Sequence, residues 1–310
     1  MANISSGSLL ALLQLGVRLS TSAYSSNYSH FKGTLFSKST TNDFEMPTFY
    51  VYTQKDTLFI IIRGSNSAHD YLTDAEITET LTNYGIFHTG FYKAALYVYK
   101  NTENIINKWK GKVFFVGHSY GGSVSQILVA ISYYYKQDID AYAISYGPMP
   151  SMYISADDPI NERIITINNN EDIVPTLSIP NVYQKFKFIF PAIEKIPIDN
   201  LVKKFNKIFN LIKLNNTDDT KLLTNLINSI PTIIRSVQDF SKGVPKFVRY
   251  PAGNVYKLKL NRPKTLKNCK INPETDLNSL TVLFTSISDH NSENYLKVVN
   301  QIREDRKKYF

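Results

Sequence analysis

One stretch, Val113–Gly122, constrains the fold of this chain more than any other. Its first part, Val113–Val116, has the length and composition of a buried strand. Gly117 and Gly121 then lie two residues to either side of Ser119, where side chains would collide in a tight strand-to-helix turn. Such a turn holds the hydroxyl above a sheet edge, in front of the positive end of a helix. The stretch predicts a nucleophilic serine, with a plain glycine-rich turn as the alternative.

Strands and helices alternate along the rest of the chain. Two runs on either side of the turn Gln54-Lys55-Asp56 predict a hairpin. The predicted strands are Thr48–Thr53, Thr57–Ile62, Asp140–Tyr146, Arg163–Ile167 and Asn254–Leu260, and the predicted helices are Phe91–Trp109, Ser123–Tyr135 and Asn294–Ile302. This alternation is typical of an α/β fold, in which helices cover both faces of a mainly parallel central sheet.

Five motifs, which follow one another along the chain in the order of the family, resemble those of the class 3 lipases, the fungal-type branch of the α/β-hydrolase fold. Beside the Gly-x-Ser-x-Gly turn, they are Ile61–Ser65 followed by Asp74, His88–Phe91 (His-x-Gly-Phe), Asn168–Pro175 (with Asp-x-Val-Pro), and Asp289-His290 ahead of Tyr295. Together they span residues 59–296. The resemblance implies a serine ester hydrolase of the α/β-hydrolase fold, with a Ser-Asp-His triad.

A nucleophilic serine needs a general base, and five histidines are available. In α/β-hydrolases the triad follows the chain order Ser, Asp, His. His118 lies inside the turn beside Ser119, with its side chain expected to point away, and His30, His69 and His88 precede the serine. His290 is the only histidine downstream, so we predict it to be the base.

The base needs a carboxylate that orients it, and Asp172 is the candidate. It follows the strand Arg163–Ile167 after a short loop, at the carboxyl edge of the predicted sheet, where catalytic groups gather. Asp157 and Asp158 precede that strand and are expected at the opposite edge, and Glu171 is not at the position of the family motif.

The resemblance also implies an oxyanion hole. In the family, one donor is the backbone N–H after the nucleophile, here Tyr120. The second is the residue after Arg-Gly, here Ser65, through its N–H and hydroxyl. Hydrolysis by such a site needs no metal or cofactor, and no His, Cys and Asp cluster in the sequence has metal-ligand spacing.

The chain departs from the family pattern in several places. The segment after Ser65, where the family has its lid, is small and polar, with Tyr71 and Leu72 as its bulky residues. The Arg of the family's Gly-x-Pro-Arg is absent after Gly147. Asp172 and His290 are 118 residues apart, which is much longer than in typical members of the family. The additional residues form a basic segment. We therefore expect a single domain over residues 1–310, with a helical insertion at about 181–243.

Most of the positive charge lies in this insertion. The net charge of the chain is +9, and residues 181–250 contain twelve Lys and Arg against five Asp and Glu, or +7. Residues 201–212 place apolar side chains on one helical face and lysines on the other. Such a helix can bind an anionic membrane surface, here through residues of about 199–240, or it can pack beside the site with solvated lysines. Recognised nucleic-acid-binding motifs are absent, so nucleic acid is not an expected partner.

The N-terminal region and the composition bear on localisation. The apolar run Leu9–Val17 can form one side of a helix with Leu19, or the core of a signal peptide, although Arg18 stands where the cleavage region should be neutral. With Cys269 as the single cysteine, we favour an intracellular protein over a secreted one. The abundance of Asn, Lys, Ile and Tyr is typical of an AT-rich genome and resembles the lipases of large insect DNA viruses, with slime moulds or protists as alternatives.

Several functions remain open at this point. The first is hydrolysis of acylglycerols or similar lipid esters, as in a triacylglycerol lipase. Phospholipase A1 activity on anionic phospholipids is the nearest rival, and feruloyl esterase activity or acyl transfer to another alcohol are further alternatives. A non-catalytic lipase-like scaffold that only binds its ligand belongs to a different class.

Overall fold

The structure of the chain is a computed structural model. It describes residues 6–29, 31–39, 43–65, 78–135, 139–169, 172–178, 181, 248–259, 269–273 and 288–302. The basic insertion, apart from Asn181, and the lid segment 66–77 lie outside the described residues, as do His30 and His69.

Seven described strands form one sheet in the order β1-β2-β3-β6-β7-β9-β10. From β3 to β10 all neighbours are parallel, whereas β1 and β2 pair antiparallel. Their bounds are β1 Thr34–Ser39, β2 Phe49–Gln54, β3 Thr57–Ile62, β6 Lys112–His118, β7 Ala141–Tyr146, β9 Ile164–Asn169 and β10 Asn254–Leu258. The predicted strands and the hairpin at Lys55 are confirmed, and so is the mainly parallel sheet.

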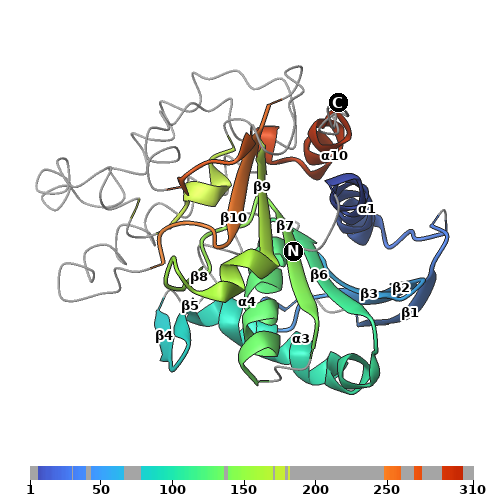
Figure 1. The fold of residues 1–310 in the computed structure, drawn as a ribbon, viewed down its shortest axis with the longest axis horizontal. Coiled ribbons are helices and arrows are strands. Elements are labelled where there is room, and N and C mark those ends of the chain that lie inside the picture. The colour runs from blue at the N-terminus through green and yellow to red at the C-terminus, as the bar shows by residue number, and fades with distance from the viewer. Residues whose placement is uncertain are drawn as a thin grey trace, which may run out of the picture.

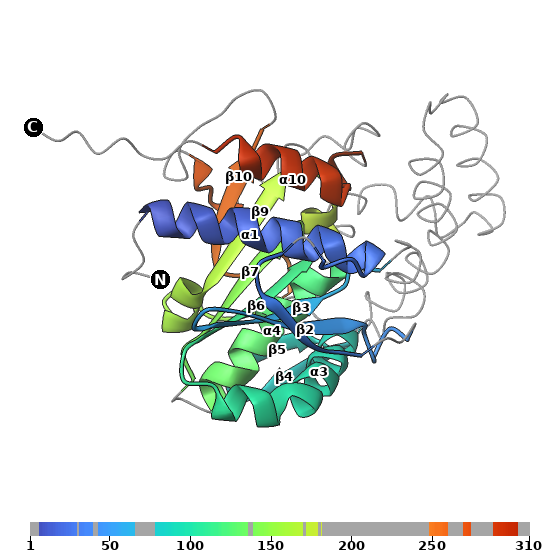
Figure 2. The same ribbon diagram turned by 90° about the vertical axis from the view of Figure 1, so that its right-hand side faces the viewer.

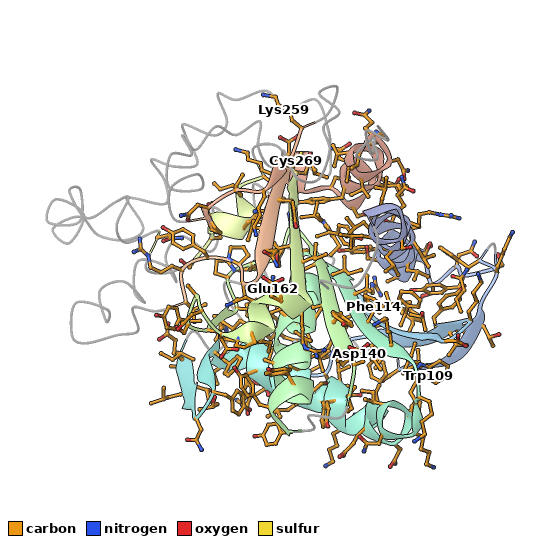
Figure 3. The ribbon with its side chains drawn as sticks, viewed as in Figure 1. Trp109, Phe114, Asp140, Glu162, Lys259 and Cys269 are labelled. Atoms are coloured by element: carbon orange, nitrogen blue, oxygen red, sulfur yellow. The ribbon has the colours of Figure 1, made fainter. Side chains whose placement is uncertain are left out.

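The central strands are apolar on both sides because both faces of the sheet are covered. Along β6, Val113 and Phe115 enter one hydrophobic core, and Phe114 and Val116 enter the other. Phe114, labelled in Figure 3, stacks on neighbouring rings at 5.7 Å and 5.4 Å between centroids. A strand buried in this way reads as a continuous apolar run rather than as an alternating one.

Among the described residues, the helices α1, α3, α4 and α10 cover the two faces of the sheet (Figures 1 and 2). Helices α3 (Thr89–Lys108) and α4 (Tyr120–Tyr135) pack on the first core. Helices α1 (Ser6–Ser25) and α10 (Ser292–Asn300) pack on the second, and Figure 2 shows them side by side across the sheet. The three helices predicted at Phe91–Trp109, Ser123–Tyr135 and Asn294–Ile302 are therefore present, and the N-terminal apolar run forms α1. The helices predicted in the insertion lie outside the described residues.

Helix α1 buries the face predicted from its apolar spacing. Leu10, Leu13, Val17 and Leu19 are all buried in the second core. The helix lies so close to the sheet that the hydroxyl of Tyr146 on β7 donates to the carbonyl of Leu13 at 2.6 Å. The N-terminal apolar run is thus a structural helix of the fold.

Two local features differ from the expectation. Helix α4 begins at Tyr120, directly after the serine, rather than at Ser123. A second sheet, with the order β4-β5-β8, was not predicted. Its strands, β4 (Glu79–Thr82), β5 (Gly85–His88) and β8 (Met152–Tyr153), have two to four residues each, too few to show a hydrophobic period.

Candidate active site

The turn between β6 and α4 holds Ser119 in a strained backbone conformation. Ser119 has a φ of 57°, in the left-handed region that few non-glycine residues adopt. Its N–H donates to the carbonyl of Tyr146 at 2.8 Å. A Cβ on Gly117 would lie 2.6 Å from the backbone nitrogen of Gly122. The turn therefore excludes a side chain at Gly117, as the sequence predicts. The hydroxyl stands at the carboxyl edge of the sheet, where β6 ends.

The structure brings together the three side chains predicted to form the triad. His290 Nε2 lies 2.7 Å from Ser119 Oγ, and His290 Nδ1 lies 2.8 Å from Asp172 Oδ2. An ionised carboxylate only accepts, so Nδ1 carries the proton and Nε2 accepts from the serine hydroxyl. Ser119 follows β6, Asp172 follows β9, and His290 ends the short helix η5 (Ser288–His290). These contacts join segments 118 and 171 residues apart in the chain.

Asp172 is fully enclosed and has donors on both oxygens. The N–H of Val174 donates to Oδ1 at 2.9 Å. The Tyr295 hydroxyl donates to Oδ2 at 2.6 Å and accepts from the N–H of Asn169 at 3.0 Å. The carboxylate therefore has a fixed orientation toward His290, which a loop acid exposed to water would lack.

Tyr295 was not predicted as a site residue. It lies on α10 and is fully buried. Burial, followed by the charge of Asp172, raises the pKa of its hydroxyl well above the usual value, so the hydroxyl keeps its proton and donates. Its proximity to the Asp289-His290 motif was visible in the sequence, but no local pattern indicates that its ring reaches back to Asp172.

Gly147, after β7, has room for no side chain. Its φ is 55°, and a Cβ there would lie 2.5 Å from the Tyr295 hydroxyl and 2.8 Å from Asp172 Oδ2. The glycine of the family-like Gly147-Pro-Met-Pro stretch is thus explained by the close approach of the carboxylate and the tyrosine.

His118 is bonded to other parts of the site, and its ring lies 4.8 Å from the ring of His290. Its Nε2 lies 2.8 Å from the carbonyl oxygen of His290, and its Nδ1 lies 2.9 Å from the hydroxyl of Tyr24 on α1. Burial, followed by the proximity of His290, lowers its pKa well below the ordinary value. A neutral imidazole therefore holds the main chain of the predicted base.

Ser65 and Tyr120, the two expected oxyanion donors, belong to segments packed against each other. A Cβ on Gly121 would lie 2.8 Å from the main-chain carbon of Ile62, and one on Gly64 would lie 2.8 Å from the carbonyl oxygen of His118. The end of β3 thus lies against the turn that carries Ser119. Tyr120 is itself held in place, because its hydroxyl donates to the carbonyl of Phe44 and its ring packs on Phe44 at 4.8 Å.

The residues set aside in the triad assignment lie elsewhere. Asp158 caps the short helix η1 (Pro159–Arg163) before β9 by accepting from the N–H of Ile160 at 3.0 Å, so it lies at the opposite edge, as expected. His88 precedes α3, and burial lowers its pKa to about 4. In the part of the chain that the structure describes, no group of three His, Cys, Asp or Glu residues could hold a metal ion. The described helices are also too short or too polar to cross a membrane.

Comparison with known proteins gives a family match over part of the chain and a similar fold. Residues 59–182 match the model of the family described as lipase (class 3). This segment contains Ser65, Ser119 and Asp172, whereas His290 lies beyond it. No curated protein sequence matches the chain.

Solved structures of fungal lipases are similar in fold. A Rhizomucor miehei lipase–propeptide complex carrying a deletion is 15% identical, with a TM-score of 0.56, over 94% of this chain and 80% of that chain. A triacylglycerol lipase from Penicillium expansum is 19% identical, with a TM-score of 0.47, over 56% and 74% of the two chains. The R. miehei triacylglyceride lipase is 18% identical, with a TM-score of 0.46, over 54% and 74%. At these identities the first likeness shows the α/β-hydrolase fold and no more.

Proposed function

We propose that this chain, whose residues 59–182 match the class 3 lipase family model, belongs to that family and is a serine hydrolase that cleaves acyl esters of lipids through Ser119, His290 and Asp172. The family match supports lipase-type ester hydrolysis. One observation carries the finer proposal: the continuous hydrogen-bonded series from Ser119 Oγ through both nitrogens of His290 to Asp172 Oδ2, at 2.7 Å and 2.8 Å.

In the first half of the reaction, Ser119 Oγ attacks the ester carbonyl while His290 Nε2 takes the hydroxyl proton. The imidazolium that forms is stabilised by Asp172, which stays ionised. The tetrahedral intermediate then collapses, His290 protonates the alcohol, and the acyl group remains on Ser119. The donors on both Asp172 oxygens hold the carboxylate in place while the charge on the imidazole changes.

In the second half, water replaces the alcohol. His290 takes a proton from the water, the resulting hydroxide attacks the acyl-enzyme, and the fatty acid leaves as the proton returns to Ser119. We assign stabilisation of the oxyanion to the N–H of Tyr120 at the start of α4 and to Ser65. Donors already in place for the developing charge provide a large part of the rate in such sites.

Phospholipase A1 activity on anionic phospholipids is the second candidate. The same triad cleaves either class of ester, and the observation that favours anionic lipids is the charge of +7 over residues 181–250. We further propose peripheral contact with an anionic membrane through residues of about 199–240, which lie outside the described residues. Rates on triacylglycerol emulsions and on phosphatidylglycerol vesicles would distinguish the two substrates.

Active-site labelling tests the main proposal. The protein is treated with a fluorophosphonate ester and its intact mass is measured, together with Ser119→Ala and the matched variant Ser125→Ala. Ser125 is a buried serine on α4 that donates to the carbonyl of Gly121 at 2.7 Å, away from the triad. We expect one adduct on the wild type and on Ser125→Ala, and none on Ser119→Ala.

Absence of the adduct on folded wild-type protein, also when anionic vesicles are present, would refute the hydrolase proposal. It would favour the non-catalytic binding scaffold. If the adduct forms, addition of glycerol or methanol to the assay shows whether the acyl group is also transferred to an alcohol other than water.

A further inference from the structure

We infer that the last turn of α1 is a positioning element of the active site, and that it acts through the hydroxyl of Tyr24. This inference rests on the proposed serine hydrolase function and assigns a role to a helix that contains no triad residue. Tyr24 is a positioning residue here, because its hydroxyl is bonded to His118 and acts on the site through that imidazole.

The partners of His118 determine which of its ring nitrogens donates and which accepts. The carbonyl of His290 can only accept, so His118 Nε2 must carry the proton and donate across the 2.8 Å contact. Because a neutral imidazole has one proton, Nδ1 is then an acceptor, and the Tyr24 hydroxyl donates to it across 2.9 Å. Tyr24 thus selects the tautomer of His118 that holds the main chain of His290.

The same hydroxyl lies against the segment that carries Ser65. A Cβ on Gly64 would overlap the Tyr24 hydroxyl and would also lie 2.8 Å from the carbonyl oxygen of His118. Gly64 directly precedes Ser65, the proposed oxyanion donor. Tyr24 therefore contacts both the strand end leading to the oxyanion hole and the turn that holds Ser119.

A third contact joins α1 to the segment after His290. Thr21 Oγ1 makes a long hydrogen bond of 3.5 Å to the carbonyl of Ser292, at the start of α10. Figure 2 shows α1 and α10 lying side by side over the sheet. One turn of α1 thus meets the three segments that carry Ser65, Ser119 and His290.

The physical consequence is control over the position of the His290 ring. Its Nε2 must remain within hydrogen-bonding distance of Ser119 Oγ while its Nδ1 remains bonded to Asp172. A displacement of about 1 Å in such a site can cost about a hundredfold in rate. Without the Tyr24 hydroxyl, Nδ1 of the buried His118 loses this donor, and the imidazole is free to change tautomer or to turn, which weakens its hold on the His290 carbonyl.

Tyr24→Phe, which removes only the hydroxyl, tests the inference. We expect kcat to fall about tenfold with KM unchanged, because the chemical step and not substrate binding depends on this contact. The rate of fluorophosphonate labelling should fall by the same factor. Tyr28→Phe is the matched control: the Tyr28 hydroxyl donates to the carbonyl of Leu19 in the same helix at 3.3 Å and lies in the second core. It should lower the melting temperature but not kcat.

Two substitutions of His118 provide a second test. The amide of Gln can donate to the His290 carbonyl, whereas Leu cannot, so His118→Gln should retain several times the kcat of His118→Leu. An unchanged kcat in Tyr24→Phe, or equal kcat losses in Tyr24→Phe and Tyr28→Phe, would overturn the inference. Either result with a labelled wild type leaves the hydrolase proposal standing, whereas an unlabelled wild type would refute both.

Discussion

Two aspartates at opposite ends of the same sheet show what burial does to a charged pair. Asp172 follows β9 at the carboxyl edge, and its side chain is 0% exposed. Asp140 precedes β7 at the other edge, labelled in Figure 3 at the lower end of that strand, and its side chain is 42% exposed. Each carboxylate accepts hydrogen bonds from basic side chains, and each lies next to a strand terminus.

The partners of the two aspartates differ in kind. Asp140 accepts from the Lys112 ammonium at 2.6 Å and from the Arg163 guanidinium at 3.2 Å. The Arg163 guanidinium also lies 5.3 Å from the centroids of two tyrosine rings. This cluster has no group that can exchange a proton near neutral pH, and half-exposed ion pairs contribute about 0.2–1 kcal/mol each.

Asp172 instead faces a histidine, the side chain whose charge changes most readily near neutral pH. It is enclosed by Tyr295 and Gly147, so water does not compete for its oxygens. An acid–base pair thus becomes a candidate for catalysis through its enclosure and through a titratable partner. The number of charged side chains at a strand end does not indicate whether a pair is a candidate for catalysis.

Replacing each carboxylate by its amide gives the largest expected contrast. Asp172→Asn should lower kcat about 10⁴-fold with the fold retained, because an amide cannot stabilise the imidazolium and favours the wrong tautomer of His290. Asp140→Asn should keep kcat within about twofold, since it breaks only a half-exposed pair. Steady-state kinetics and circular dichroism of both variants provide the measurement. Comparable losses of kcat in the two variants would contradict this view of the sheet edges.

Removing a tyrosine hydroxyl near each aspartate should give a smaller contrast. Tyr295→Phe removes one of the donors to Asp172 Oδ2, and loss of a hydrogen bond to a charged group costs about 1.5–3 kcal/mol. We expect kcat to fall about tenfold to a hundredfold, at unchanged KM. Tyr142→Phe, beside Asp140, should leave kcat unchanged. The role of Tyr295 would be disproved by a wild-type kcat in Tyr295→Phe.

The buried histidines and the half-exposed Asp140 should contribute to the free energy of unfolding in different pH ranges. Burial lowers the pKa of His88 to about 4 and that of His118 well below 6.5. The contribution of these two histidines to the free energy of unfolding is complete above their unfolded pKa of 6.5. It declines as the pH falls toward their folded pKa, because the unfolded chain then binds more protons than the folded one. Burial alone would raise the pKa of Asp140, but the hydrogen bonds from Lys112, Tyr142 and Arg163, together with the charge of Lys112, outweigh burial and lower it. The contribution of Asp140 to the free energy of unfolding is therefore lost only below its ordinary pKa of 3.8.

Denaturant unfolding between about pH 7 and pH 4.5 tests this order. The wild type should lose stability over that range, and His88→Gln should lose less of it, since one depressed histidine pKa is removed. Asp140→Asn should follow the wild-type curve in the same range. A flat wild-type curve, or a steep change that disappears in Asp140→Asn, would contradict the assignment.

Salt should produce the smallest effect. Raising the ionic strength to about 1 M shortens the screening length to about 3 Å, which weakens the exposed Asp140 cluster but not the enclosed pair. We expect the melting temperature of Asp140→Asn to lie no more than about 2 °C below that of the wild type at low salt. The difference should narrow at high salt. A difference that stays the same at every ionic strength would indicate that Asp140 acts through packing rather than through its charge.

The features that the sequence predicts best are those whose physical cause lies within a few neighbouring residues. Gly117 and Gly121 flank Ser119 at fixed spacing because the turn itself excludes side chains there, and that constraint lies within a few residues of the chain. Apolar runs such as Val113–Val116 likewise reflect coverage of both sheet faces. The assignments of His290 and Asp172 additionally needed the chain order of the fold, and their geometry is as expected, while their catalytic role stays a proposal.

The contacts between distant segments follow only from the tertiary structure. Tyr24 meets His118 across 94 residues, and His118 meets the carbonyl of His290 across 172. Tyr295 meets Asp172 across 123 residues, and Gly147 is confined by both of these side chains. No local period or motif encodes such pairs, because they depend on how closely α1 and α10 pack on the sheet. The candidate reactive groups can therefore be identified from local motifs and chain order, whereas the side chains that hold them in place depend on the packing of these two helices.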